Sequence, residues 1–227
     1  MSSYFTPRTF RFLRALARHN EREWFQAHKA DYETHVREPF LRLIGDLQGP
    51  IAGISPHYIA NPRKMGGSLF RIHRDVRFSN NKAPYKTWSG ARCYHERARQ
   101  VHCPSFYIHI EPGNNFFGGG LWHPETATQR RIRDFIVDNP DAWMRATGNR
   151  DFLERFQWRG DSLVRTPQGY PADHPLIEDL KRRDFAVGQS LADATVTGPD
   201  LLDTLVEGFR AAAPLVDYLC AALDLEF

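Results

Sequence analysis

Residues 106–122 read FYIHIEPGNNFFGGGLW. The apolar residues of the first half fall at every second position, at Phe106, Ile108 and Ile110. This period is typical of a β-strand that buries one face. The turn formers at 112–115 predict a tight connection, and the extended run after them predicts the second strand of a hairpin.

A second alternation precedes the hairpin at residues 70–78. Its apolar residues occupy one face of a predicted strand and its charged residues the other: Phe70, Ile72, Val76 and Phe78 against Arg71, His73, Asp75 and Arg77. Arg74 lies in the apolar register, where an unpaired guanidinium is costly to bury. We therefore expect Arg74 to be largely buried and bonded to a carboxylate or to several carbonyls, with Arg74 and Asp75 as residues that serve the fold through ion pairing.

Helical spacing surrounds these strands. Thr6 and Pro7 predict the start of a helix that ends at Asn20, and Asn20 with Glu23 resembles a capping box that opens a second helix. The second helix is predicted to run through residue 44 and to bend near Pro39, because proline lacks the backbone N–H of a helix interior. A connection is predicted for residues 50–62.

Further helices are predicted after the hairpin, around residues 125–136 and from 199 to 223. Strands bracketed by helices at both ends, with little alternation of strand and helix, indicate an α+β fold: a mainly antiparallel sheet flanked by N-terminal and C-terminal helices. Neither a repeat nor a linker interrupts the chain, so residues 1–227 are predicted to form a single domain.

The charge of the chain is concentrated in one window. The whole sequence has 30 Lys and Arg against 27 Asp and Glu. Residues 61–102 hold ten basic residues and two acids, a net charge of +8, which leaves the remainder of the chain acidic. This distribution favours a binding site for an anion within the window.

Composition also excludes some classes of protein. No apolar run approaches the roughly 20 residues that cross a bilayer, so no membrane partner is expected. Three cysteines at unrelated spacings argue against a disulfide framework and for a reducing, cytoplasmic location. No phosphate-binding loop or dinucleotide fingerprint occurs, so we expect no cofactor.

The candidate binding residues lie in and after the predicted strand at 70–78. Arginine offers a planar fork of donors to phosphate or carboxylate, and lysine adds a mobile charge. The proposed set is Arg71, His73, Arg77, Lys82, Tyr85 and Lys86. It favours a small anionic or phosphorylated ligand, which the protein binds or also turns over.

Two alternatives remain open for this segment. One is a nucleic-acid-binding module, in which Tyr85, Trp88 and Tyr94 stack on bases. The other is a structural or interaction protein without a ligand, in which the charges pair among themselves.

Three weaker patterns carry competing interpretations. His73 and Asp75 could provide a general acid and base together with His109 and Glu111 if the two strands were neighbours in the sheet. Alternating polar residues on a strand are more often a face exposed to solvent. The Cys and His residues at positions 93, 95, 102 and 103 do not have a zinc-binding spacing, so we expect no metal site. The glycines at 118–120 indicate a tight strand or bulge rather than a phosphate loop.

The segment from Arg71 to Lys86 also carries a family resemblance. It matches the pattern R-x-x-R-D-x-R-F-S-x-x-K-x-P-Y-K. Together with NEREWF from Asn20, the turn HIEPG from His109, PQGY from Pro167 and LK from Leu180, it resembles a widespread uncharacterised family of bacterial and fungal conserved hypothetical proteins. The resemblance covers nearly the whole chain and implies one domain of that family's fold, with no activity or catalytic residue to carry over.

Overall fold

An antiparallel sheet of six strands forms the centre of the computed structural model, which describes residues 3–227. The strand order is β1-β2-β3-β4-β6-β5, and all neighbouring strands are antiparallel. The strands are β1 (Tyr58–Ile59), β2 (Ser89–His95), β3 (Ser105–Ile110), β4 (Asn115–Leu121), β5 (Gln157–Arg159) and β6 (Phe185–Leu191). The predicted hairpin of residues 106–122 is therefore confirmed as β3 and β4.

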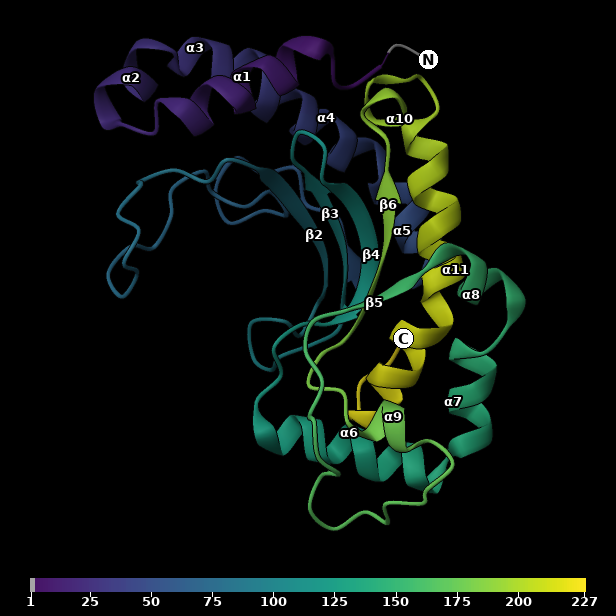
Figure 1. Cartoon of the computed structure of the whole chain (residues 1–227). Helices are drawn as coiled ribbons and strands as arrows, with labels where there is room; N and C mark the ends of the chain where they lie inside the picture. Colours follow the sequence, from purple (N-terminus) through teal and green to yellow (C-terminus); the bar gives the residue numbers. More distant parts are fainter. Residues whose placement is uncertain (1–2) are drawn as a thin grey trace.

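Helices lie at both ends of the sheet and along one of its faces (Figure 1). The N-terminal group crosses one end of the sheet and comprises α1 (Pro7–Arg18), α2 (Arg22–Ala27), α3 (Lys29–Tyr32), the π-helical turn η1 (Glu33–Arg37), α4 (Glu38–Asp46) and α5 (Gln48–Ile54). The later helices are α6 (Thr126–Asp138), α7 (Pro140–Thr147), α8 (Arg150–Arg155), α9 (Ile177–Leu180), α10 (Asp193–Thr197) and α11 (Leu201–Ala222). This arrangement confirms the α+β class. Within residues 3–227, no helix is long and apolar enough to span a bilayer.

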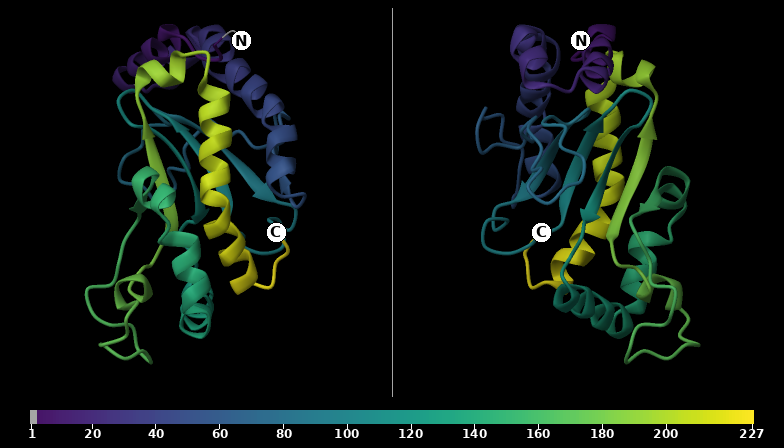
Figure 2. Two further views of the ribbon diagram at one scale, coloured as in Figure 1. Left: turned by 90° about the vertical axis from the view of Figure 1, so that its right-hand side faces the viewer. Right: turned by 60° about the vertical axis from the view of Figure 1, so that its left-hand side comes forward.

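The long helix α11 lies against one face of the sheet, as Figure 2 shows from two sides. Phe209 of α11 contacts Phe106 of β3 and Phe117 of β4, with ring centroids 5.2 and 5.6 Å apart. All three rings are fully buried. Because side chains alternate between the faces of a strand, the intervening residues of β3 and β4 point to the opposite face, which α11 leaves open.

The glycines of β4 allow β6 to approach closely. A Cβ atom at Gly118 would lie 1.8 Å from the carbonyl oxygen of Val187, and Gly120 has a φ of +125°, which side-chain-bearing residues rarely adopt. These positions need glycine for backbone packing. The prediction of a tight strand at residues 118–120 is therefore confirmed.

Three details of the N-terminal helices differ from the prediction. Asn20 does not cap α2, whose N-cap is Glu21 without a side-chain hydrogen bond. Near Pro39, where a bend is predicted, the helix is interrupted by the π-helical turn η1, which ends two residues before that proline. Proline has no N–H for the carbonyl of His35, and the hydroxyl of Thr9 donates to that carbonyl instead at 2.7 Å. The connection predicted from residue 50 begins with helix α5.

The prediction of a strand at residues 70–78 is wrong. This segment leaves the sheet and folds back on itself, with a single bridge between His73 and Tyr85. Only Ile72 of its four apolar residues is buried, and Phe78 is 95% exposed. Because no second layer lies under the far end of the segment, alternation there does not mark a buried face. Residues 71–86, called the finger below, protrude from the molecule (Figure 1).

Candidate functional site

The finger is anchored through Tyr85. Its ring is buried and stacks on Phe25 of α2 with centroids 4.1 Å apart. The side-chain amide of Asn20 donates to the carbonyl of Tyr85 at 2.9 Å and accepts from its N–H at 3.0 Å. Tyr85 therefore joins the finger to the N-terminal helices, while the exposed His73 lies beside it with ring centroids 5.2 Å apart.

The charges in the finger are arranged differently from the predicted ion pair. Asp75 pairs with Arg77, at 2.7 Å between Oδ2 and Nη2, and this contact lowers the pKa of Asp75. Arg74 is half-buried and donates to the carbonyl of Ala83 at 3.2 Å, not to a carboxylate. The finger folds back over Arg74, so that the carbonyl of Ala83 and the hydroxyl of Ser79 are the acceptors of its guanidinium. The expected ion pair between Arg74 and Asp75 is therefore wrong.

The remaining predicted binding residues point in different directions. At the tip, Lys82 donates to the carbonyl of Val76 at 3.1 Å. At the base, Lys86 donates to the carbonyl of the exposed Arg71 at 2.9 Å. Since Arg77 is held at the tip by its carboxylate partner, the finger does not gather its cations at one point. Lys86 is the member that faces the sheet.

Lys86 begins a row of five side chains across the open face of the sheet. Its Nζ lies 4.9 Å from the ring centroid of Trp88. The ring of Trp88 lies 4.8 Å from that of His109, and the ring of His109 stacks on Phe116 at 4.7 Å. The guanidinium of Arg159, from edge strand β5, covers the other side of the row at 4.7 Å from Phe116. We call this row the strip: Lys86, Trp88, His109, Phe116 and Arg159.

The strip ends in cations that lack acidic partners. Within residues 3–227, neither Lys86 nor Arg159 forms an ion pair. The same holds for Arg92 of β2, which lies opposite Tyr107 of β3. The pKa of Lys86 is lowered, mainly by burial and to a smaller extent by the positive charge of Arg71. The buried Nε of Arg159 has no hydrogen-bond partner. Its Nη2 donates to the hydroxyl of Ser190 at 3.4 Å, and the guanidinium has further N–H donors to offer an anion.

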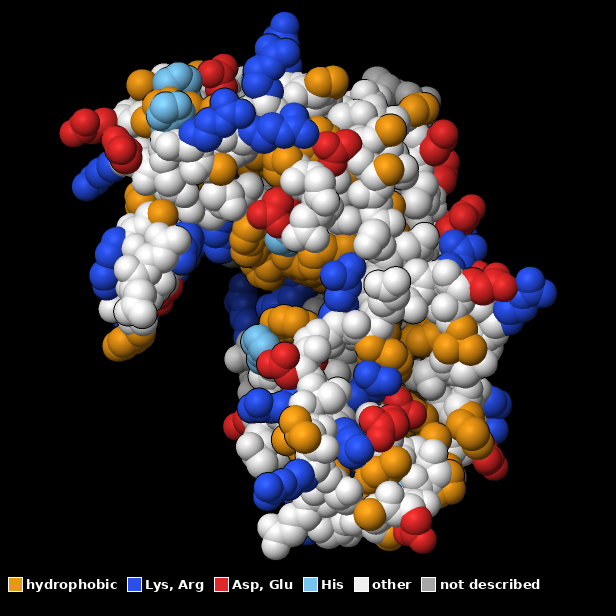
Figure 3. All heavy atoms as spheres, in the orientation of Figure 1, with side chains coloured by type: hydrophobic (Ala, Val, Ile, Leu, Met, Phe, Trp, Pro, Cys, Tyr) orange, Lys and Arg blue, Asp and Glu red, His pale blue; other side chains and the backbone are white. Residues whose placement is uncertain are grey.

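Figure 3 shows that the surface is hollowed between the finger and the lower part of the molecule. Hydrophobic and basic side chains lie next to each other in this hollow. The strip residues other than His109 are half-buried, so their rings and charges remain accessible from one side. The combination offers a row of ring edges between two positive charges.

Beside the strip, three polar side chains of β3 and its end form a hydrogen-bonded chain. The hydroxyl of Tyr107 lies 2.9 Å from Nδ1 of His109, and Nε2 of His109 lies 3.3 Å from Oε2 of Glu111. An ionised carboxylate only accepts hydrogen bonds, so we assign the ring proton to Nε2 and the accepting lone pair to Nδ1. Burial lowers the pKa of His109, against the opposing effect of Glu111. His73 and Asp75 lie in the finger and do not join this chain.

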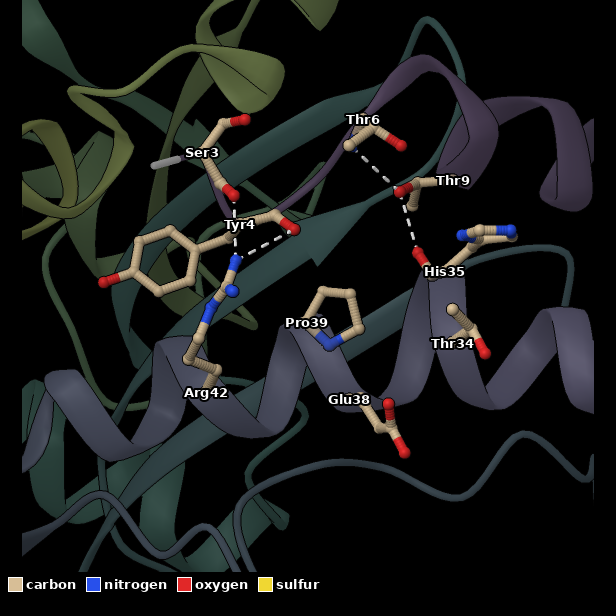
Figure 4. Close-up of a pocket in the computed structure, with 9 residues that line it drawn as sticks. All are labelled: Ser3, Tyr4, Thr6, Thr9, Thr34, His35, Glu38, Pro39 and Arg42. Carbon is tan, nitrogen blue, oxygen red and sulfur yellow. Dashed lines mark hydrogen bonds between the residues drawn. The ribbon is translucent and has the colours of Figure 1, made fainter. Parts of the chain in front are cut away.

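A separate cavity of about 480 Å³ lies between the N-terminal segment and α4. Figure 4 shows the residues that line it: Ser3, Tyr4, Thr6, Thr9, Thr34, His35, Glu38, Pro39 and Arg42. Several of its polar groups already bond to one another, since Thr9 donates to His35 and Arg42 donates to the carbonyls of Ser3 and Tyr4. The cavity contains none of the predicted binding residues.

The cysteines and His95 are buried and serve the fold, whereas His102 is exposed. All three cysteines of the chain carry free, buried thiols. His95 bonds to the carbonyl of Glu226 at 2.9 Å and to the N–H of Arg97 at 3.1 Å, so both ring nitrogens have backbone partners. Across residues 3–227, no group of three His, Cys, Asp or Glu side chains is placed to hold a metal ion.

Comparison with protein families gives one match. The model of the conserved hypothetical protein family DUF2461 matches residues 8–218. The chain belongs to this family. No curated protein and no solved structure matches the chain. The family match therefore extends over the finger and all the strands that carry the strip.

Sequence reasoning found only part of the site in this family member. The strict alternation of Phe106, Ile108 and Ile110 leaves Tyr107, His109 and Glu111 on the opposite face of that strand. The same reasoning did not find Phe116 or Arg159. Arg159 reaches the site only because β5 pairs with β6, and no local pattern in the sequence indicates that pairing.

Proposed function

We propose that this chain binds a small anionic ligand on the open face of its sheet, along the strip. The supporting observation is the pair of unpaired cations, Lys86 and Arg159, at the two ends of a row of accessible rings. Of the binding residues predicted in the finger, Lys86 remains part of the proposed site. Of the other site residues, His109, Phe116 and Arg159 lie on strands of the sheet and Trp88 directly precedes β2. Arg77 and Lys82 are excluded as main binding groups, because their side chains bond at the finger tip and neither contacts a ring of the strip, whereas Lys86 contacts Trp88.

The arrangement selects for ligands with both a charge and a flat ring. A planar group can pack against the exposed edges of Trp88 and Phe116, whose ring faces already contact His109 and the two cations. An attached phosphate or carboxylate can then bond to the guanidinium of Arg159, whose planar fork suits these anions. Such bonds between charged groups contribute about 1.5–3 kcal/mol each. An aromatic phosphate or carboxylate therefore fits the strip better than inorganic phosphate.

A single-stranded nucleic acid is the second candidate, because aromatic rings and cations on an open antiparallel sheet also stack and hold bases. Salt distinguishes the two. A strand that neutralises many phosphates loses affinity steeply as salt rises, whereas a small ligand at two cations is less sensitive.

The test uses thermal unfolding with four probes: inorganic phosphate, benzoate, adenosine monophosphate and a short oligothymidylate. A probe at 100 times its dissociation constant stabilises the folded state by about 2.7 kcal/mol. This corresponds to about 5–10 °C for a chain of this size. We expect the ring-bearing anions to give such a shift and inorganic phosphate a smaller one.

Variants locate the binding. Arg159→Gln is expected to weaken binding of adenosine monophosphate by about 10–100-fold, the equivalent of one charged hydrogen bond. Arg77→Ala is the matched control, since it removes an arginine of the same window that already has a partner. Equal losses in both variants, or no shift with any anion, would show that the strip is not the site. Oligothymidylate binding with a steep salt dependence would establish the second candidate.

A further inference from the structure

We propose that Tyr107, His109 and Glu111 form a proton relay that makes the Tyr107 hydroxyl a nucleophile toward an anionic ester bound on the strip. The inference rests on the proposed function for its substrate class. The three groups form a hydroxyl–imidazole–carboxylate chain, in the order that activates the nucleophile in hydrolases built on a catalytic triad. They share the open face with the unpaired cations of the strip.

The backbone of β2 supports this placement of the hydroxyl. A Cβ atom at Gly90 would lie 2.7 Å from the Tyr107 oxygen and 3.1 Å from a ring carbon of Trp88. Glycine therefore leaves room for the hydroxyl to lie against β2, within reach of His109 and beside a ring of the strip. A side chain at this position would push the hydroxyl or the indole away.

The carboxylate end of the chain is also held in place. Oε2 of Glu111 accepts from the amide of Asn114 at 2.7 Å as well as facing Nε2 of His109. His109 itself is fixed between the rings of Trp88 and Phe116. Glu111 is thus a positioning residue that orients the imidazole and stabilises its charged form, while Tyr107 is the residue that would touch the substrate.

The chemical step balances within these groups. The Tyr107 oxygen forms a bond to the electrophilic centre of the ester, and its proton passes to Nδ1 of His109. The bond from that centre to the leaving group breaks, and the leaving group departs with the electron pair. Glu111 then faces an imidazolium. Burial, and then the charge of Glu111, raise the pKa of Tyr107, so the hydroxyl needs His109 to accept the proton as the bond forms.

The probe for this step is 4-(fluorosulfonyl)benzoate, which combines a flat ring, a carboxylate and an electrophilic sulfur. The Tyr107 oxygen attacks sulfur, fluoride leaves, and a sulfonate ester remains on the protein. Intact mass and peptide mapping report which side chain is modified. The chain has 8 tyrosines, and Tyr94 provides an internal control, because it lies on the same face beneath Arg92 but has no imidazole next to its hydroxyl.

We expect a single adduct at Tyr107. His109→Ala, with folding checked by thermal unfolding, is expected to slow the labelling about 100-fold or more, the usual contribution of a general base. Added imidazole should restore part of the rate, since it can occupy the space left by the side chain. A purely structural histidine would not give this rescue. Glu111→Gln is expected to slow labelling about tenfold while the chain remains folded.

The outcomes separate the relay from the anion site. Labelling of Tyr94 or Lys86 in place of Tyr107, absence of any adduct, or a wild-type rate in folded His109→Ala each overturns the relay. Benzenesulfonyl fluoride, which lacks the carboxylate, tests the other part. If it labels Tyr107 as readily as the charged probe and Arg159→Gln changes neither rate, the relay stands and the anion site is wrong.

Discussion

Replacing Asn20 with alanine tests how the finger is held to the N-terminal helices. The side-chain amide of Asn20 makes both hydrogen bonds of the Tyr85 peptide groups, at 2.9 and 3.0 Å. Each such bond contributes about 1 kcal/mol net, and Asn20 is half-buried, so water replaces the lost partners only in part. We expect Asn20→Ala to lower the free energy of unfolding by about 2 kcal/mol.

For a chain of this size, that loss corresponds to a fall of about 4–8 °C in the unfolding temperature. The local effect should be larger than the global one, because the ring of Tyr85 keeps its stacking on Phe25 while its backbone is released. Hydrogen exchange of the Tyr85 amide is therefore expected to accelerate in the variant. Asn20→Asp should give no recovery, since its second carboxylate oxygen would face the carbonyl of Tyr85 where the amide now donates.

The assay is differential scanning calorimetry combined with hydrogen exchange read at Tyr85. Asn80→Ala is the matched control, since Asn80 is an exposed residue of the same finger, and its loss should stay within about 0.5 kcal/mol. Unchanged unfolding and unchanged exchange in Asn20→Ala would refute the reasoning. The stacking of Tyr85 would then hold the finger by itself.

Other substitutions test the core, the relay and the finger tip. Gly208→Ala would place a methyl group 2.1 Å from the ring of Phe117 and should cost about 1–3 kcal/mol by calorimetry, whereas Gly53→Ala in α5 has free space and should not destabilise. The pKa of His109 is lowered from 6.5, so the unfolded chain binds more protons than the folded chain below that pH. The contribution of His109 to the free energy of unfolding should therefore be fully present above pH 6.5 and be lost as the pH drops through the folded pKa. Urea unfolding at several pH values should show that the free energy of unfolding depends less on pH in His109→Gln than in the wild type. Arg77→Ala should leave the unfolding temperature unchanged in a thermal melt, because its ion pair is exposed and screened; a clear loss would mean that the tip is more ordered than its exposure implies.

The parts of the fold that the sequence predicted are those with local causes. The hairpin of β3 and β4 follows from strict alternation and a turn, both contained within 106–122. The alternation at residues 70–78 has the same form, yet the strand predicted from it is absent. Burial of one face also requires a second layer that packs against it. Phe78 occupies the alternating sequence position of a core residue, but its side chain is exposed because no other element within residues 3–227 packs against it.

The candidate site was predictable to the same extent. Lys86 and His109 are visible in the sequence as members of polar patterns, but nothing local brings them together. Their proximity depends on Trp88, which contacts both, and on the register of β2 against β3. The far end of the site depends on β5, a strand of only three residues with no alternation to identify it.

The strand order also determines the sequence of events by which the chain assembles its site. Strands β2, β3 and β4 are consecutive, so their pairings close short loops and should form early. The pairing of β4 with β6 must wait for residues 122–184 to close as one long loop, and β5, which pairs with β6, can join the sheet only together with β6 or after it. Arg159 is therefore expected to arrive later than the strip residues on β3 and β4. A chain on its way to the folded state would already have the hydrogen-bonded pair Tyr107 and His109 before it had Arg159, the cation that we propose selects charged ligands.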